Sequence, residues 1–260
     1  MSGLRPPPFK CVVKRTPHCG AFGEMNLETV DLIIKSATSF YEELRTDENG
    51  RYRSWEHCYK RFHDARNNDS ADYDYLSLHL AFYLASWGMY RGSSFLLQKD
   101  YKVHIPVIKE LLKSKYDSLF GMECKLIREK DIQERLENIN TFIRSYYDKI
   151  RKTVKETEVK NELSDTLTTK ILMGTLGCVP AYDRYFIDGV KREKVTTGIY
   201  NKNSLLKLAD FYEDNRKKLE ETRKGLKVYN LSYPQMKLLD MGFWQIGFDS
   251  DDSKGLKIAH

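Results

Sequence analysis

The stretch TLTTKILMGTLGCVPAYDRYFIDGVK, from Thr166 to Lys191, shows the pattern that dominates this chain of 260 residues. An apolar run ends at a Gly-x-x-Gly break, and Pro180 then opens a second run that carries Asp183. Apolar residues at three- and four-residue spacing are typical of helices, and a proline fits the first helical turn. We expect two helices, with Gly174 and Gly177 ending the first or letting it pack closely.

The same periodicity extends outward on both sides of this stretch. The run YLSLHLAFYLASWGMY, residues 75–90, is apolar nearly all round, which is typical of a central helix covered on all sides. The strand-like alternation is confined to KCVVKR, residues 10–15. The sequence therefore predicts an all-α fold of about eight to ten helices. Further helices are expected to begin near Asn26, Ser54, Pro106, Cys124, Asn203 or Ser204, and Tyr233.

We expect one domain over residues 1–260, or as the alternative two helical lobes with a cleft between them. Residues 1–24 are expected to form an extended N-terminal arm. Residues 249–260 are expected to form an acidic, flexible tail.

Composition excludes several classes of protein. The sequence lacks the long uncharged apolar run of a membrane span and the apolar region of a signal peptide. The five cysteines are scattered, which favours reduced thiols in the cytoplasm over a disulfide framework or a zinc site. The net charge of +6 is compatible with an anionic partner such as nucleic acid. We expect no cofactor and no membrane association.

The histidines give no clear metal site. His57 and His63 are six residues apart on one expected helix, so they do not face one ion as an i, i+4 pair would. His79 lies in the apolar run and is expected in the core. Cys11, His18 and Cys19 would need further ligands that the sequence does not identify. We therefore expect no metal.

The order of features around Asp183 resembles the helix–hairpin–helix DNA glycosylase superfamily. TLTTKILMGTLGC is similar to the helix that follows the family's hairpin, and VPAYDRYF is similar to its hydrophobic–Pro–x–x–Asp segment. The resemblance implies DNA as the partner, and a catalytic carboxylate at Asp183 that stabilises the sugar, or positions water, as a flipped base leaves. It covers about residues 160–192. A lysine nucleophile, where the family has one, would fall near Lys160.

The resemblance also implies two sets of supporting residues. The family's hairpin glycines are replaced here by NELSDTLTTK, so hydroxyls and nearby cations would contact the DNA phosphates. The residues expected to bind nucleic acid are Ser164, Thr166, Thr168, Lys170, Arg184, Lys191 and Arg192. The residues expected to line the pocket are Tyr182, Tyr185, Phe186, Trp87, Tyr90, Arg91 and Trp244.

Two alternatives remain open. A helical protein that binds nucleic acid or protein without catalysis, for example in phage defence or regulation, needs no reactive carboxylate. A helical nuclease toxin of the HEPN type would use an Arg and a His on one helix, for which Arg53 and His57 are the nearest pair. Structural roles also account for Asp183 as a helix-start carboxylate and for the aromatic residues as core.

Overall fold

The structure, a computed structural model, describes residues 22–68, 71–154 and 163–255. Within these ranges the chain is mostly helical, and the predicted all-α class is confirmed. The α-helices are α1 (Phe22–Thr46), α2 (Ser54–Arg66), α3 (Tyr73–Ser86), α4 (Ile105–Leu111), α5 (Lys130–Thr153), α6 (Asp165–Thr175), α7 (Arg184–Arg192), α8 (Lys202–Asp214), α9 (Arg216–Gly225) and α10 (Gln235–Gly255). The short 3₁₀ helices are η1 (Arg51–Arg53), η2 (Phe95–Gln98), η3 (Tyr101–His104), η4 (Ser114–Leu119) and η5 (Cys124–Arg128). Strands β1 (Lys227–Val228) and β2 (Leu231–Ser232) form an antiparallel hairpin.

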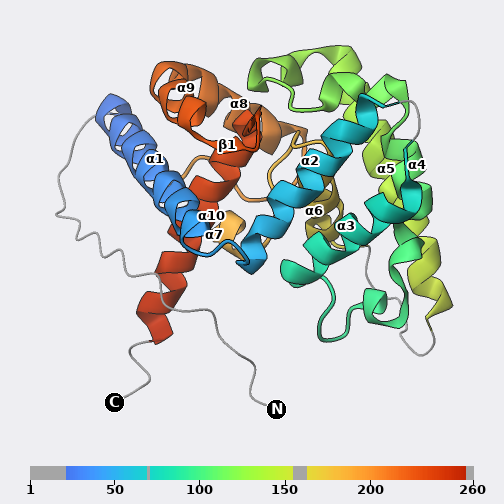
Figure 1. Ribbon diagram of the computed structural model, residues 1–260. Coiled ribbons are helices and arrows are strands. Elements are labelled where there is room, and N and C mark those ends of the chain that lie inside the picture. Colours follow the sequence, from blue (N-terminus) through green and yellow to red (C-terminus); the bar gives the residue numbers. More distant parts are fainter. Residues whose placement is uncertain (1–21, 69–70, 155–162, 256–260) are drawn as a thin grey trace.

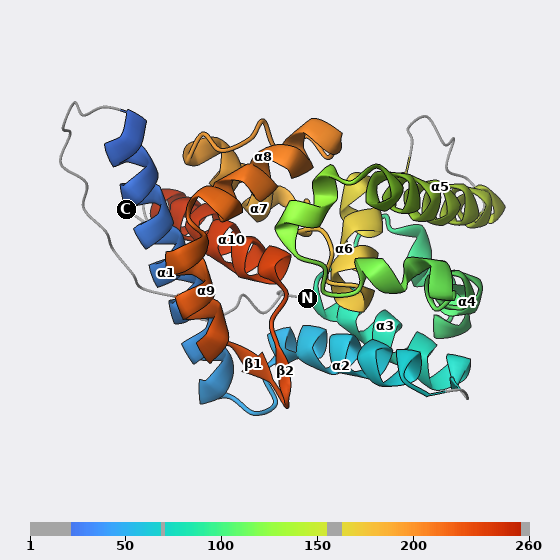
Figure 2. The ribbon, with the colours of Figure 1, turned by 90° about the horizontal axis from the view of Figure 1, so that it is seen from above.

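The helices gather in two groups around α10 and α6. Helices α1, α7, α8, α9 and α10 lie on one side of the molecule, and α2 to α6 lie on the other (Figures 1 and 2). A single hydrophobic cluster contains side chains from both groups. No helix in the described ranges is both long and apolar enough to cross a membrane.

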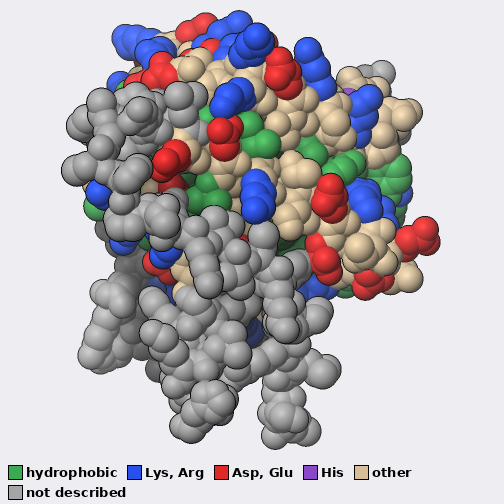
Figure 3. Space-filling model, turned by 90° about the vertical axis from the view of Figure 1, so that its left-hand side faces the viewer, with side chains coloured by type: hydrophobic (Ala, Val, Ile, Leu, Met, Phe, Trp, Pro, Cys, Tyr) green, Lys and Arg blue, Asp and Glu red, His purple; other side chains and the backbone are tan. Residues whose placement is uncertain are grey.

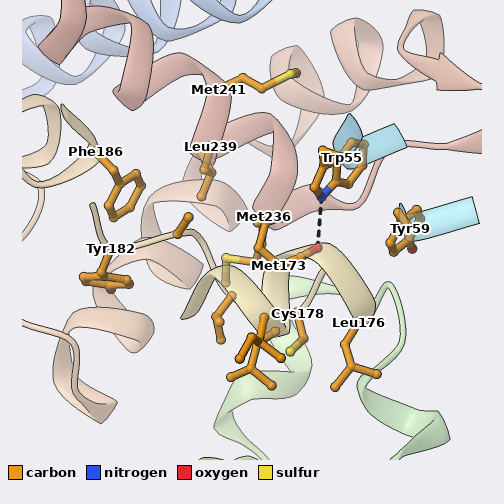
Figure 4. Packing of buried hydrophobic residues seen from close by; sticks show 14 of the residues in the cluster. Trp55, Tyr59, Met173, Leu176, Cys178, Tyr182, Phe186, Met236, Leu239 and Met241 are labelled. Atoms are coloured by element: carbon orange, nitrogen blue, oxygen red, sulfur yellow. Dashed lines mark hydrogen bonds between the residues drawn. The ribbon is translucent and has the colours of Figure 1, made fainter. Parts of the chain in front are cut away.

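The core at the junction of the groups is built from α2, α6, α7 and α10. The indole Nε1 of Trp55 on α2 donates to the carbonyl oxygen of Met173 on α6 at 3.0 Å (Figure 4). Phe186 and Leu239 pack in the same region, from α7 and α10. A donor that would be costly to bury alone is thereby satisfied inside the core.

Helices α7 and α10 approach each other backbone to backbone. A β-carbon placed on Gly189 would lie 2.0 Å from the carbonyl oxygen of Phe243, and one on Gly247 would lie 2.0 Å from that of Tyr185. Only glycine fits at either position, because the obstacle is main chain and cannot rotate away. The α7 helix and the residues before it are therefore held in a fixed place against α10.

Several expected boundaries are corrected. Helix α1 begins at Phe22, so residues 22–24 of the expected arm are helical, and α10 runs to Gly255 through the first part of the expected tail. The single helix expected from residue 203 or 204 is two helices, α8 and α9, separated at Asn215, and the side chain of Asn201 caps the first of them. The expected strand at residues 10–15 lies outside the described residues, as do Cys11, His18, Cys19 and Lys160.

The prediction that the apolar run from residue 75 is covered on all sides is wrong. Helix α3 buries Leu76, Leu80 and Leu84 against the core but leaves Leu78 and Phe82 exposed. A helix that is covered on all sides and a helix that exposes one apolar face have similar sequences, because both contain few polar residues.

Candidate functional site

The segment before Asp183 is extended rather than helical. Gly177, with φ of +64°, ends α6 as expected, and the next helix begins only at Arg184. Pro180 is therefore not a first-turn proline, which corrects the sequence prediction. Gly174 has the other expected role, since a β-carbon there would lie 2.4 Å from the ring of Tyr83.

This extended segment is held by side chains from α6 and α10. Thr166 Oγ1 donates to the carbonyl oxygen of Tyr182 at 2.9 Å, and the amide of Tyr182 donates to Thr169 Oγ1 at 2.9 Å. The amide of Ala181 donates to Asp240 Oδ1 at 2.8 Å. Buried main-chain groups outside a helix need such partners, so three distant side chains fix the position of the residue that follows.

That residue, Asp183, is the N-cap of α7. Its Oδ1 accepts from the amide of Phe186 at 3.1 Å, and its Oδ2 lies 3.2 Å from the ammonium of Lys170. The carboxylate retains 13% of its side-chain exposure, whereas Lys170 retains 5%. The helix N-terminus and the ammonium both stabilise the negative charge.

A second buried ion pair lies close to the first. Lys237 and Asp240 of α10 are 2.8 Å apart and are almost fully buried. Lys170 Nζ donates to the carbonyl oxygen of Trp87 at 2.8 Å, and Lys237 Nζ lies 5.3 Å from the centroid of the Trp87 ring. Both ammonium groups thus meet at one tryptophan, and each has a carboxylate partner.

Aromatic side chains surround this tryptophan. The aromatic cluster consists of Phe40, Tyr52, Trp87, Tyr185, Trp244 and Phe248. The ring centroids of Trp87 and Trp244 are 5.8 Å apart, and Tyr52 lies 4.8 Å from Trp87. Tyr52, Trp87 and Tyr185 are half-buried, so the cluster has ring surface at its edge.

The two tryptophans carry donors that the described residues do not satisfy. The Nε1 atoms of Trp87 and Trp244 are buried and have no hydrogen-bond partner within the described ranges. A buried indole N–H usually finds an acceptor.

The expected site residues separate into three groups. Lys170, Asp183, Trp87, Tyr185 and Trp244 come together here. Thr168, Tyr182 and Phe186 are in the core, so burial removes Thr168 from the expected phosphate contacts and the other two from the expected pocket wall. Lys170 is likewise too buried to bind a phosphate at the surface.

The remaining expected residues lie elsewhere. Tyr90 donates to or accepts from the buried His104, and Arg91 is exposed beyond the end of α3. Ser164, Arg184, Lys191 and Arg192 are exposed, while Thr166 is occupied with Tyr182. Lys237, Asp240 and Tyr52 were not predicted; a Lys and an Asp three residues apart inside the apolar run of α10 were the signal available for the first two.

The surface cations of α7 lie among carboxylates. Arg184 pairs with Asp251 at 2.6 Å. Lys191 and Arg192 line a groove of about 390 Å³ together with Asp188 and Asp251. Where described residues are visible on the left-hand face of the molecule, basic and acidic side chains are interspersed (Figure 3).

Another groove lies outside the predicted site. It has a volume of about 640 Å³ and runs along α5 and the start of α8, where Asn140, Arg144 and Tyr200 are among its lining residues.

The two residues of the toxin alternative, Arg53 and His57, each contact a different partner. Arg53 Nε lies 3.3 Å from Glu56, and His57 Nδ1 lies 2.9 Å from the hydroxyl of Tyr229.

His104 should make stability sensitive to acid. It is buried between the hydroxyls of Tyr90 and Tyr147, and burial lowers its pKa from 6.5 to about 3. The unfolded chain therefore binds this proton at a higher pH than the folded chain, and stability is lost as pH falls from 6.5 towards 3. The loss reaches up to about 1.4 kcal/mol per pH unit. In urea unfolding across this range, His104→Gln should show a flatter pH dependence than wild type. Equal slopes for His104→Gln and wild type would contradict this prediction.

The fold and site together define an all-α protein with paired buried lysines and aspartates beside an aromatic cluster. No protein-family model, curated protein or solved structure matches the chain.

Proposed function

We propose that this protein binds DNA and acts as a glycosylase-like enzyme in which Asp183 is the reactive carboxylate. The observation that carries the proposal is the setting of Asp183. It keeps partial solvent access at a helix N-terminus, 3.2 Å from Lys170, next to aromatic side chains with unsatisfied indole donors. Charged pairs in such surroundings occur at catalytic sites as well as in structural networks.

The chemistry suits cleavage of the bond between a base and its deoxyribose. As that bond breaks, positive charge develops on the sugar and negative charge on the departing base. The carboxylate of Asp183 would stabilise the sugar until a water molecule adds to it in place of the base, and the indole N–H groups of Trp87 and Trp244 would donate hydrogen bonds to the departing base. The half-buried rings of Tyr52 and Tyr185 would provide stacking surface for a base taken out of the duplex.

The DNA backbone would be held by the exposed cations of α7. Lys191 and Arg192 lie on the helix that Asp183 caps, and the chain has a net charge of +6. Contacts of this kind give an affinity that falls steeply with salt.

A non-catalytic binding protein is the second candidate. The ion pair of Lys170 with Asp183, together with the cap on the Phe186 amide, occupies both carboxylate oxygens within the fold. Under this hypothesis Asp183 stabilises the start of α7 and no bond is broken.

Replacing Asp183 by asparagine separates the two candidates. Asparagine is a good N-cap, so Asp183→Asn keeps the cap while it removes the negative charge. Because this leaves the buried ammonium of Lys170 without its counter-charge, thermal unfolding of the variant is measured as well, to show that it is folded under the conditions of the assay. The proposal predicts a loss of base release by about a hundredfold or more. The measurement is base release from duplex oligonucleotides, each carrying one deaminated, alkylated or oxidised base. DNA affinity and its salt dependence are measured in parallel and should be unchanged.

The matched control is Asp188→Asn, an exposed carboxylate on the same helix, which should leave base release unchanged. Absence of base release by wild type from every duplex would refute the enzymatic proposal. DNA affinity with a steep salt dependence would then support the second candidate, and absence of DNA affinity at low salt would refute the nucleic-acid partner altogether.

A further inference from the structure

An apolar stripe runs along the solvent side of α3. It consists of Tyr75, Leu78, Phe82 and Ala85, spaced by three, four and three residues. Tyr75, Leu78 and Phe82 retain 43%, 51% and 59% of their exposure. These positions follow the a and d spacing of a heptad, the pattern by which one helix packs along another. The opposite side of α3 supplies Leu76, Leu80 and Leu84 to the core, so the stripe is not needed for the fold of the chain itself.

The concentration of apolar surface on this helix is unusual for the molecule. Of the large hydrophobic side chains that are exposed in the described residues, four belong to α3, and the others are Leu97, Ile199 and Tyr229. Single exposed apolar residues are ordinary, but an aligned set marks an interaction surface. In Figure 1, α3 lies beneath α2.

We propose that the stripe is the interface of a homodimer in which α3 packs antiparallel against α3 of a second copy. In a register centred between Leu78 and Phe82, Leu78 lies opposite Phe82 of the second copy, and Tyr75 lies opposite Ala85 of the second copy. Each of these pairs, or layers, places a large aromatic ring opposite a smaller side chain, which allows close packing. A two-fold axis generates all of these layers from one patch.

The charges at the ends of α3 select the antiparallel arrangement. Asp72 is exposed at its N-terminal end, where its side chain caps the helix, while the neighbouring Asp74 is paired with Lys102. Arg91 is exposed beyond its C-terminal end, where its guanidinium packs against Gly88. Antiparallel pairing places Asp72 of each copy near Arg91 of the other. It also aligns the helix dipoles favourably, whereas parallel pairing brings like charges together.

Concentration-dependent sedimentation tests the interface. Wild type should pass from monomer to dimer between low micromolar and near-millimolar concentrations. Leu78→Glu and Phe82→Glu should each weaken the dimer by about tenfold or more, because a charge would be buried in every central layer. Both positions are exposed, so thermal unfolding of the variants should match wild type. The control is Ile199→Glu, which removes an exposed apolar side chain elsewhere and should leave association unchanged.

Cross-linking tests the register. In a background with Cys11→Ser and Cys19→Ser, the double variant Leu78→Cys/Phe82→Cys should form a covalent dimer on mild oxidation. Leu78→Cys alone should not, because its two copies lie in successive layers and are too far apart for a disulfide. The remaining cysteines, Cys58, Cys124 and Cys178, are buried.

Three results would overturn the proposal. A wild-type protein that stays monomeric over the whole range would exclude a second copy as the occupant, even if it then bound another protein or a vesicle. Association that is insensitive to Leu78→Glu and Phe82→Glu would place the interface elsewhere. Efficient cross-linking of Leu78→Cys alone would exclude the antiparallel register.

Discussion

Gly189→Ala is expected to lower the free energy of unfolding by about 3 kcal/mol or more, at the upper end of overpacking effects. The added β-carbon would lie 2.0 Å from the carbonyl oxygen of Phe243, inside any allowed contact. That oxygen belongs to the main chain of α10, so relief requires the two helices to move apart. The same argument applies to Gly247→Ala against the carbonyl oxygen of Tyr185. Urea unfolding followed by circular dichroism measures the change.

Gly225→Ala is the matched control for this prediction. Gly225 is the last residue of α9, has no atom within 4 Å of its added β-carbon and does not adopt a positive φ. Its replacement should leave stability unchanged or raise it by about 0.4–1 kcal/mol, since alanine restricts the unfolded chain. Similar stabilities for Gly189→Ala and Gly225→Ala would show that α7 and α10 are not packed this closely.

Asp240→Asn is expected to lower the free energy of unfolding by about 3–5 kcal/mol. The substitution keeps an acceptor for the Ala181 amide but leaves the ammonium of Lys237 buried without its counter-charge. The rings of Trp55 and Trp87, with centroids 4.8 and 5.3 Å from Lys237 Nζ, only partly stabilise that charge. The change is measured by urea unfolding at neutral pH.

The double variant Asp240→Asn/Lys237→Met distinguishes two causes of destabilisation, the loss of the counter-charge of Lys237 and a change in side-chain packing. With both charges removed, most of the stability should return, because a buried pair can be replaced by neutral groups of similar size. Asp31→Asn breaks the exposed ion pair with Lys218 and should cost less than about 1 kcal/mol. If Asp240→Asn were as mild as Asp31→Asn, the burial of the Lys237 charge would be contradicted.

Much of the fold follows from local sequence. The spacing of apolar residues predicts α1, α2 and α5, because each must bury one continuous face. Gly177 ends α6 as predicted, since glycine adopts a positive φ without strain. The boundary at Pro180 was wrong because a proline that is compatible with a first helical turn is equally compatible with extended chain.

The site was less predictable, because its contacts join residues far apart in the chain. Asp183 was singled out from a local motif, and its cap on Phe186 is local too. Its partner Lys170 was assigned instead to nucleic-acid binding, because a lysine near the threonine-rich start of a helix is typical of a surface-exposed cation. Asp240 was missed, because its role depends on the amide of Ala181, which lies 59 positions earlier.

The sequence by itself determined the helical class, the end of α6 at Gly177 and the presence of a carboxylate at the start of α7. These features depend on interactions within a few residues, namely side-chain periodicity, backbone dihedrals and caps. Only the tertiary structure decided which charges are buried and which apolar residues are exposed. Lys170 and Lys237 are buried because distant carboxylates and rings surround them. Phe82 is exposed because α3 presents its other side to the core, and burial of a side chain depends on what the rest of the chain packs against it.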